Sequence, residues 1–209
     1  DRGLCGGFNN SINKYAEDYY KENKDKFDNL DLLLIGRRSL DYFNRRDIGN
    51  IDSILNLAKD ISYDLASDIA DKLIKGFTEN SYDEIRFIYN EFKSVLSQEL
   101  TAETILPIDL EQSVFSSSNE EKFSEDLIFE PAPEEIIDVL LQKHFTVQVY
   151  RILSESIAAE HAARMTAMDN ATTNAKDMID NLTLTFNKLR QAAITTELTE
   201  ICSGAEALK

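Results

Sequence analysis

A run of 70 residues, 134–203, contains neither glycine nor proline, and it constrains the fold more than any other feature. Pro131 and Pro133 precede the run, two glutamates open it and Gly204 follows it. Proline and acids at the start and glycine at the end are typical helix boundaries. The pattern predicts a helix about 105 Å long at 1.5 Å per residue. We expect its apolar stripe to need a packing partner.

Two stretches of this run refine the prediction. Phe145–Tyr150 alternates like a strand, which leaves a break or kink near 143–147 open. We favour a continuous helix, because helical patterning flanks the segment and no turn residue separates it. Beyond it, a coiled-coil-like seam recurs at steps of three and four residues. The seam consists of Met168, Ala171, Ala175, Met178, Leu182, Phe186, Leu189 and Ala193.

The first 108 residues are predicted to form a compact α/β domain, with helices on a mixed, Rossmann-like sheet. The expected order is strand, helix, strand, helix, strand, strand, beginning at the apolar stretch Gly3–Phe8. Helices are expected at 12–27 and 62–77, and strands at 32–35, 83–89 and within 95–108. Residues 109–132 are rich in acids and serines, which predicts a flexible acidic loop. The predicted parts are therefore 1–108, 109–132 and the long helix 133–209.

Composition and motifs exclude several kinds of chemistry. The net charge of −16 argues against nucleic acid and anionic lipid as partners. The glycines at 3, 6 and 7 lack the Lys-Ser/Thr of a phosphate loop and the spacing of a dinucleotide fingerprint. Two distant cysteines and two histidines supply no metal or disulfide pattern. We expect no catalytic residue, no metal, no cofactor, and no membrane-spanning segment.

Charge along the long helix is uneven. Residues 181–196 contain Lys188 and Arg190 but no acid. In so acidic a chain, this stretch indicates an acidic partner surface, with chance placement as the alternative.

Six blocks of residues, in order along nearly the whole chain, carry a family resemblance. They are Asp1–Asn9, Leu34–Arg38, Ile88–Phe92, Leu106–Ile108, Glu160–Met168 and Asn187–Ile201. The first four resemble the central domain, and the last two the C-terminal helix, of the gamma subunit family of the rotary F-type ATP synthase. The resemblance implies a non-catalytic central rotor shaft that couples proton flow through the ring of c subunits to the catalytic sites of the beta subunits.

The resemblance also implies partners, a place and residue roles. The α/β domain would contact the c ring and the epsilon subunit. The long helix would form half of an antiparallel coiled coil inside the hexamer of alpha and beta subunits. Arg164 matches a position that faces the hexamer, and the positions near acidic loops of beta are Arg190, Gln191, Thr195 and Glu197. The expected location is the cytoplasmic face of a bacterial inner membrane, with the mitochondrial matrix face as runner-up.

The sequence departs from the family at its start. A long N-terminal helix precedes the Arg2–Gly7 block in the family, and we expect that helix, the coiled-coil partner, to be missing from this chain. Two alternatives are a generic coiled-coil scaffold and a small α/β enzyme with a helical oligomerisation tail. Copurification with alpha, beta and epsilon subunits would exclude the scaffold, and a nucleotide-binding assay would test the enzyme.

Overall fold

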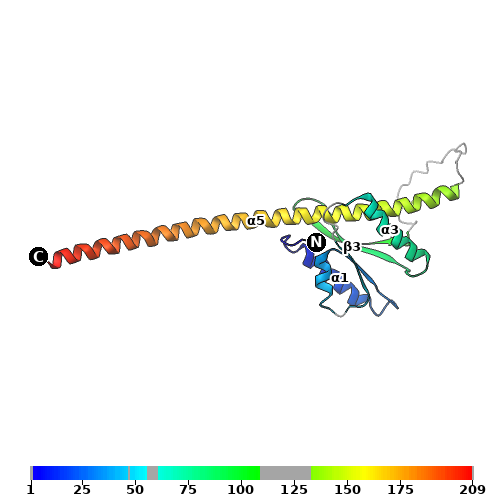
Figure 1. Cartoon of the computed structure of the whole chain (residues 1–209), viewed down its shortest axis with the longest axis horizontal. Helices are drawn as coiled ribbons and strands as arrows, with labels where there is room; N and C mark the ends of the chain where they lie inside the picture. Colours follow the sequence, from blue (N-terminus) through cyan, green and yellow to red (C-terminus); the bar gives the residue numbers. More distant parts are fainter. Residues whose placement is uncertain (1, 47, 56–60, 109–132, 209) are drawn as a thin grey trace, which may run out of the picture. The chain divides into compact units, whose positions relative to one another are not determined.

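The computed structural model describes residues 2–46, 48–55, 61–108 and 133–208. The chain divides into two compact units, Asp1–Met165 (unit 1) and Thr166–Lys209 (unit 2). Its elements are α1 (Phe8–Asn23), β1 (Leu32–Ile35), α2 (Arg37–Phe43), β2 (Ile51–Ile54), α3 (Tyr63–Thr78), β3 (Ile85–Phe92), β4 (Gln98–Leu106) and α5 (Pro133–Ala207) (Figure 1). The predicted acidic loop 109–132 lies outside the described residues, so the division at 108 and 133 stays a prediction.

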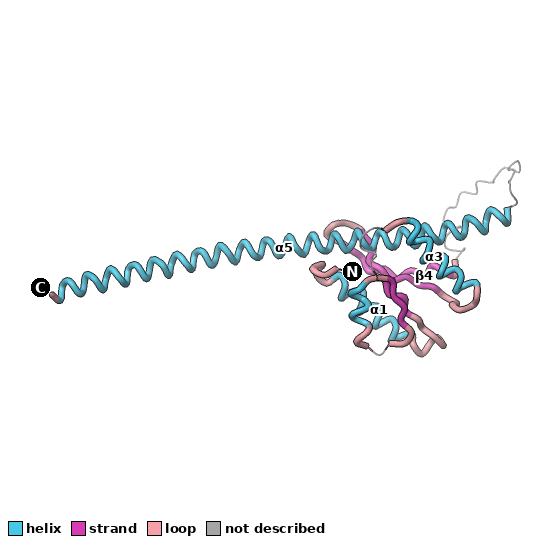
Figure 2. The backbone as a smooth tube through the Cα atoms, in the orientation of Figure 1, coloured by secondary structure: helices cyan, strands magenta, loops and turns pink. Residues whose placement is uncertain are grey.

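The described strands form two pairs. β1 and β2 are parallel, with Leu34 opposite Ser53, and β3 and β4 are antiparallel, with Tyr89 opposite Thr101. The strands are drawn in magenta in Figure 2. The apolar run at 32–35 forms β1 as predicted. The α/β class with a long C-terminal helix is confirmed, and within the described residues its strands lie in these two separate pairs.

The N-terminal stretch differs from the prediction. Gly3–Gly7 forms turns that lead into α1, because Leu4 and Gly6 have φ angles of 63° and 59°, which are incompatible with strand pairing. The short elements α2 and β2 were also not predicted. Gly36, with φ of 111°, makes the sharp turn from β1 into α2.

The core of unit 1 joins three elements that are far apart in the sequence. Its buried side chains come from α3, from the β3–β4 hairpin and from the first half of α5. α3 begins where the pattern predicted, because the Leu65 amide donates a hydrogen bond to the Ser62 hydroxyl, at 3.2 Å. α5 contributes Phe145, Val149, Ile152 and Leu153, of which Phe145 and Val149 are 2% and 0% exposed.

No break interrupts α5 at 143–147. The segment is helical, and the Thr146 hydroxyl donates to the Gln142 carbonyl one turn earlier, at 3.0 Å. Phe145 and Val149 lie four residues apart on one face of the helix, so the apparent strand alternation is overridden by burial of that face.

Unit 2 consists of the remainder of α5. None of its described side chains is buried, and the coiled-coil-like seam is open to solvent, with Met178, Leu182 and Phe186 between 61% and 64% exposed. Among the described helices of the chain, none offers a segment of sufficient length and hydropathy to cross a membrane.

Candidate functional site on the long helix

The described residues contain no cluster of histidine, cysteine, aspartate or glutamate side chains that could hold a metal ion. The main polar features of α5 are the networks that hold its first half to other elements, and the exposed side chains of its second half.

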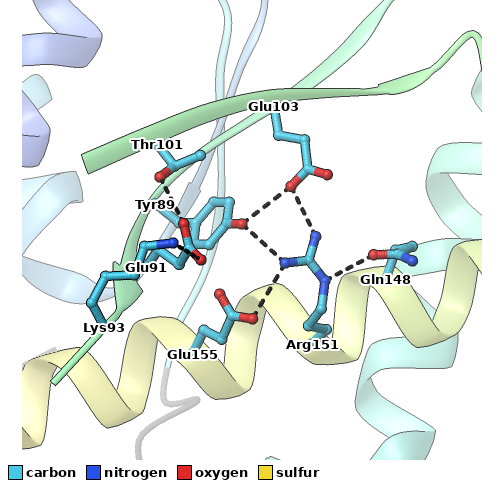
Figure 3. A network of polar contacts seen from close by, with 8 residues as sticks. All are labelled: Tyr89, Glu91, Lys93, Thr101, Glu103, Gln148, Arg151 and Glu155. Atoms are coloured by element: carbon cyan, nitrogen blue, oxygen red, sulfur yellow. Dashed lines mark hydrogen bonds and ion pairs between the residues drawn. The ribbon is translucent and has the colours of Figure 1, made fainter. Parts of the chain in front are cut away.

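Arg151, in the first half of α5, is the centre of the network drawn in Figure 3. Its guanidinium donates to the Glu103 carboxylate on β4 at 2.8 Å and to the Tyr89 hydroxyl on β3 at 3.2 Å. Gln148 and Glu155, from α5 itself, accept two further bonds at 2.8 and 3.3 Å. Tyr89 in turn donates to Glu103 at 3.1 Å. We call these five residues the Arg151 network.

Burial and hydrogen bonding oppose each other within this network. Partial burial works to lower the pKa of Arg151, but the hydrogen bonds to Glu103 and Tyr89 outweigh it and raise that pKa above its ordinary value. Burial is also the main reason that the pKa of Tyr89 is raised. Arg151 therefore stays charged and Tyr89 stays neutral at physiological pH, which keeps both as hydrogen-bond donors.

A second arginine, Arg164, connects α5 to the N-terminal turn. Its Nε donates to the Gly3 carbonyl at 3.3 Å, and its guanidinium also pairs with Glu160 one turn earlier. Both side chains are largely enclosed, at 21% and 15% exposed. The structure thus places Arg164, predicted to face the hexamer, in contacts within unit 1. Its role toward a partner stays a prediction.

The other four predicted contact residues lie in unit 2, and all are exposed. At 100° per residue, Gln191 and Thr195 share one side of the helix, opposite the apolar seam, whereas Arg190 and Glu197 flank that seam. The Thr195 hydroxyl donates to the Gln191 carbonyl at 2.8 Å. The four residues therefore form two adjacent surfaces of unit 2, whereas Arg164 belongs to unit 1.

Sequence reasoning did not single out the Arg151 network. Glu103 and Tyr89 precede Arg151 by 48 and 62 positions, so no helical or strand spacing relates them. The local signals are the i, i+3 contact of Gln148 with Arg151 and the i, i+4 pair of Arg151 and Glu155, and both spacings are common on any helix surface.

Comparisons with known proteins agree with one another. Residues 1–208 match the ATP synthase family described as ATP-synt. The ATP synthase gamma chain of Bdellovibrio bacteriovorus is 59% identical, over all of this chain and 72% of the relative's length. The gamma chain of Geobacter metallireducens is 44% identical, over all of this chain and 71% of that relative.

Solved structures give the same result. The central stalk and c ring of the Tetrahymena thermophila mitochondrial ATP synthase include a chain with a TM-score of 0.63 and 27% identity, covering 82% of this chain and 72% of that one. A chain of the Euglena gracilis mitochondrial ATP synthase, at 24% identity and a TM-score of 0.66, covers all of this chain and 70% of that one, and supports the fold alone.

Proposed function

The chain belongs to the ATP synthase gamma chain family, and from this premise we propose which of its surfaces meet which subunits. As a member of that family it is the rotor shaft of the ATP synthase and a non-catalytic subunit; the catalytic sites are in the beta subunits. It works within the synthase complex as part of the central stalk.

The exposed second half of α5 is proposed to contact the alpha and beta subunits. The single observation that carries this proposal is the acid-free stretch 181–196, which lies on helix without a buried side chain, in a chain of net charge −16. Arg190, Gln191, Thr195 and Glu197 are the proposed contact residues near beta, and Arg164 is proposed to face the hexamer. The apolar seam flanked by Arg190 would pack against a second helix in an antiparallel coiled coil, which leaves Gln191 and Thr195 facing outward toward beta.

Unit 1 is proposed to contact the epsilon subunit and the c ring. The chain would be a peripheral subunit on the cytoplasmic face of a bacterial inner membrane, rather than on the mitochondrial matrix face. The bacterial origin of the similar gamma chains supports this choice. Antibody labelling of inverted and right-side-out vesicles tests it, since labelling of right-side-out vesicles alone would contradict the proposed side.

Charge reversal at position 190 tests the proposed contact with beta. A charge-assisted hydrogen bond contributes about 1.5–3 kcal/mol when desolvated and about 0–1 kcal/mol when exposed. We therefore expect Arg190→Glu in the assembled synthase to weaken assembly or coupled proton pumping. Arg190→Lys should do less harm, because the charge remains and only the planar fork is lost.

Lys176→Glu is the matched control, because it reverses a charge on the same helix outside the acid-free stretch. ATP hydrolysis and ATP-driven proton pumping by reconstituted complexes are the measurements. Equal behaviour of Arg190→Glu, Lys176→Glu and the unchanged protein would contradict an electrostatic contact at this end of α5.

A further inference from the structure

α5 is held to the rest of unit 1 mainly by an apolar stripe. The buried residues of its first half include Phe145, Val149, Ile152 and Leu153, all at most 6% exposed. Apolar burial is favourable but has no preferred direction. A stripe of this kind attaches the helix firmly, yet it resists a roll of the helix about its own axis only through the shape of the packed side chains.

Arg151 lies beside this stripe, about 100° round the helix from Ile152. From that flank its guanidinium reaches both strands of the hairpin, through Tyr89 on β3 and Glu103 on β4. Gln148 and Glu155 hold the same guanidinium from one turn before and one turn after. The planar group is therefore fixed both on its own helix and on the hairpin (Figure 3).

The geometry of the Arg151 network matters more than its contribution to stability. Arg151 and Glu103 are 36% and 39% exposed, and ion pairs of that exposure contribute little net free energy. These hydrogen bonds also depend on distance and angle, so they oppose a rotation of the helix even where they add little stability. A roll of about 15° would carry a group at the edge of a helix roughly 1.5 Å sideways. Where that displacement points along a bond of 2.8 Å, it lengthens the bond to about 4.3 Å, which is beyond hydrogen-bond distance.

We propose that Arg151 is a positioning residue of the rotor, which fixes the rotational register of α5 on the β3–β4 hairpin. Torque carried by α5 is then passed to the hairpin, and the helix does not rotate about its own axis against its apolar contacts. The proposal rests on the function proposed above, because only a shaft that transmits torque needs this register. It assigns to Arg151 a role that its sequence context does not indicate.

Three variants of the assembled synthase test the proposal. Arg151→Met keeps a long unbranched side chain but removes the charge and every donor. Arg151→Lys keeps the charge without the fork, and Arg45→Met makes the same change at an exposed arginine outside the Arg151 network. The measurements are the torsional stiffness of single rotating complexes and the number of protons pumped per ATP hydrolysed.

We expect Arg151→Met to lower both the stiffness and the protons pumped per ATP, while ATP hydrolysis continues. Arg151→Lys should lie between Arg151→Met and the unchanged protein, and Arg45→Met should match the unchanged protein. Salt gives an independent reading, since the screening length falls from about 10 Å at 0.1 M to about 3 Å at 1 M. The unchanged protein should soften toward the stiffness of Arg151→Met as salt rises, whereas Arg151→Met itself should not.

Unchanged stiffness and pumping in Arg151→Met would overturn the proposal, and so would equal salt responses of the two proteins. If Arg151→Met fails to assemble, Glu103→Gln decides by the same two criteria, because it removes the partner's charge and keeps its size. Failure of the proposed function itself would look different, since the unchanged chain would then not assemble into a rotating complex.

Discussion

Replacing Val149 by alanine tests whether α5 is part of the core of unit 1. Val149 is 0% exposed and packs with side chains of α3 and the hairpin. Val147, two residues earlier on the same helix, is 49% exposed. The two valines therefore allow one chemical change to be made in two environments, with the helix propensity of alanine as a shared term.

The expected loss at Val149 follows from its burial. Removing two buried methyl groups costs about 1.6 kcal/mol in transfer free energy, at about 0.8 kcal/mol for each group. A residual cavity raises the total to roughly 2–3 kcal/mol. At Val147 the half-exposed methyl groups lose less and no cavity forms. The better helix propensity of alanine returns up to about 0.7 kcal/mol at both positions and cancels in the comparison. We expect the free energies of unfolding of the two variants to differ by about 2 kcal/mol.

Urea unfolding followed by tyrosine fluorescence measures this difference, because the chain has eight tyrosines and no tryptophan. With a slope near 2 kcal/mol per M, the midpoint of Val149→Ala should lie about 1 M below that of Val147→Ala. Equal midpoints would refute the reasoning, since they would mean that the 145–153 turns of α5 are not seated in the core.

Two further predictions concern the N-terminal half. Bonds from Lys21 and Tyr42, with Arg46 nearby, lower the pKa of Glu17 to about 2 from 4.5. The ionised Glu17 carboxylate therefore contributes fully to stability above about pH 4.5, and this contribution is lost as the pH falls toward 2. Glu17→Gln should flatten the acid limb of a profile of unfolding free energy against pH. An acid limb as steep as that of the unchanged protein would contradict this. Gly36→Ala should destabilise unit 1 by about 1–3 kcal/mol, because φ of 111° strains any residue with a Cβ; thermal unfolding measures this loss, and an unchanged midpoint would contradict it.

The long elements of the fold follow from the sequence because their signals are local. The run without glycine or proline predicts α5 nearly to its ends. Ser62 predicts the start of α3, and the apolar run at 32–35 predicts β1. The short elements do not follow in this way. α2 has seven residues and β2 has four, and both depend on neighbours that are distant in the sequence, such as the pairing of Leu34 with Ser53.

The candidate site also has features that the sequence shows and features that only the structure shows. The charge pattern at 181–196 is visible in the sequence, and the contact residues proposed there came from the family resemblance. The structure adds that Gln191 and Thr195 face away from the apolar seam. The sequence does not show that the Arg151 network reaches the hairpin, because Tyr89 and Glu103 lie on strands that are distant from Arg151 along the chain. Arg164 shows the converse, since its expected partner is outside the chain and its present contacts are Gly3 and Glu160.

The shared core of α3, the hairpin and α5 has a consequence for synthesis of the protein. Leu106 is the last core residue of the hairpin, and the α5 residues that cover the core extend to Leu153. A ribosome adding 5–20 residues per second needs roughly 2–10 s to pass between those two positions. During that interval the nascent chain presents Leu73, Ile85 and Tyr89 without their cover, so a chaperone that binds apolar segments would have its best opportunity there, before α5 emerges and closes the core.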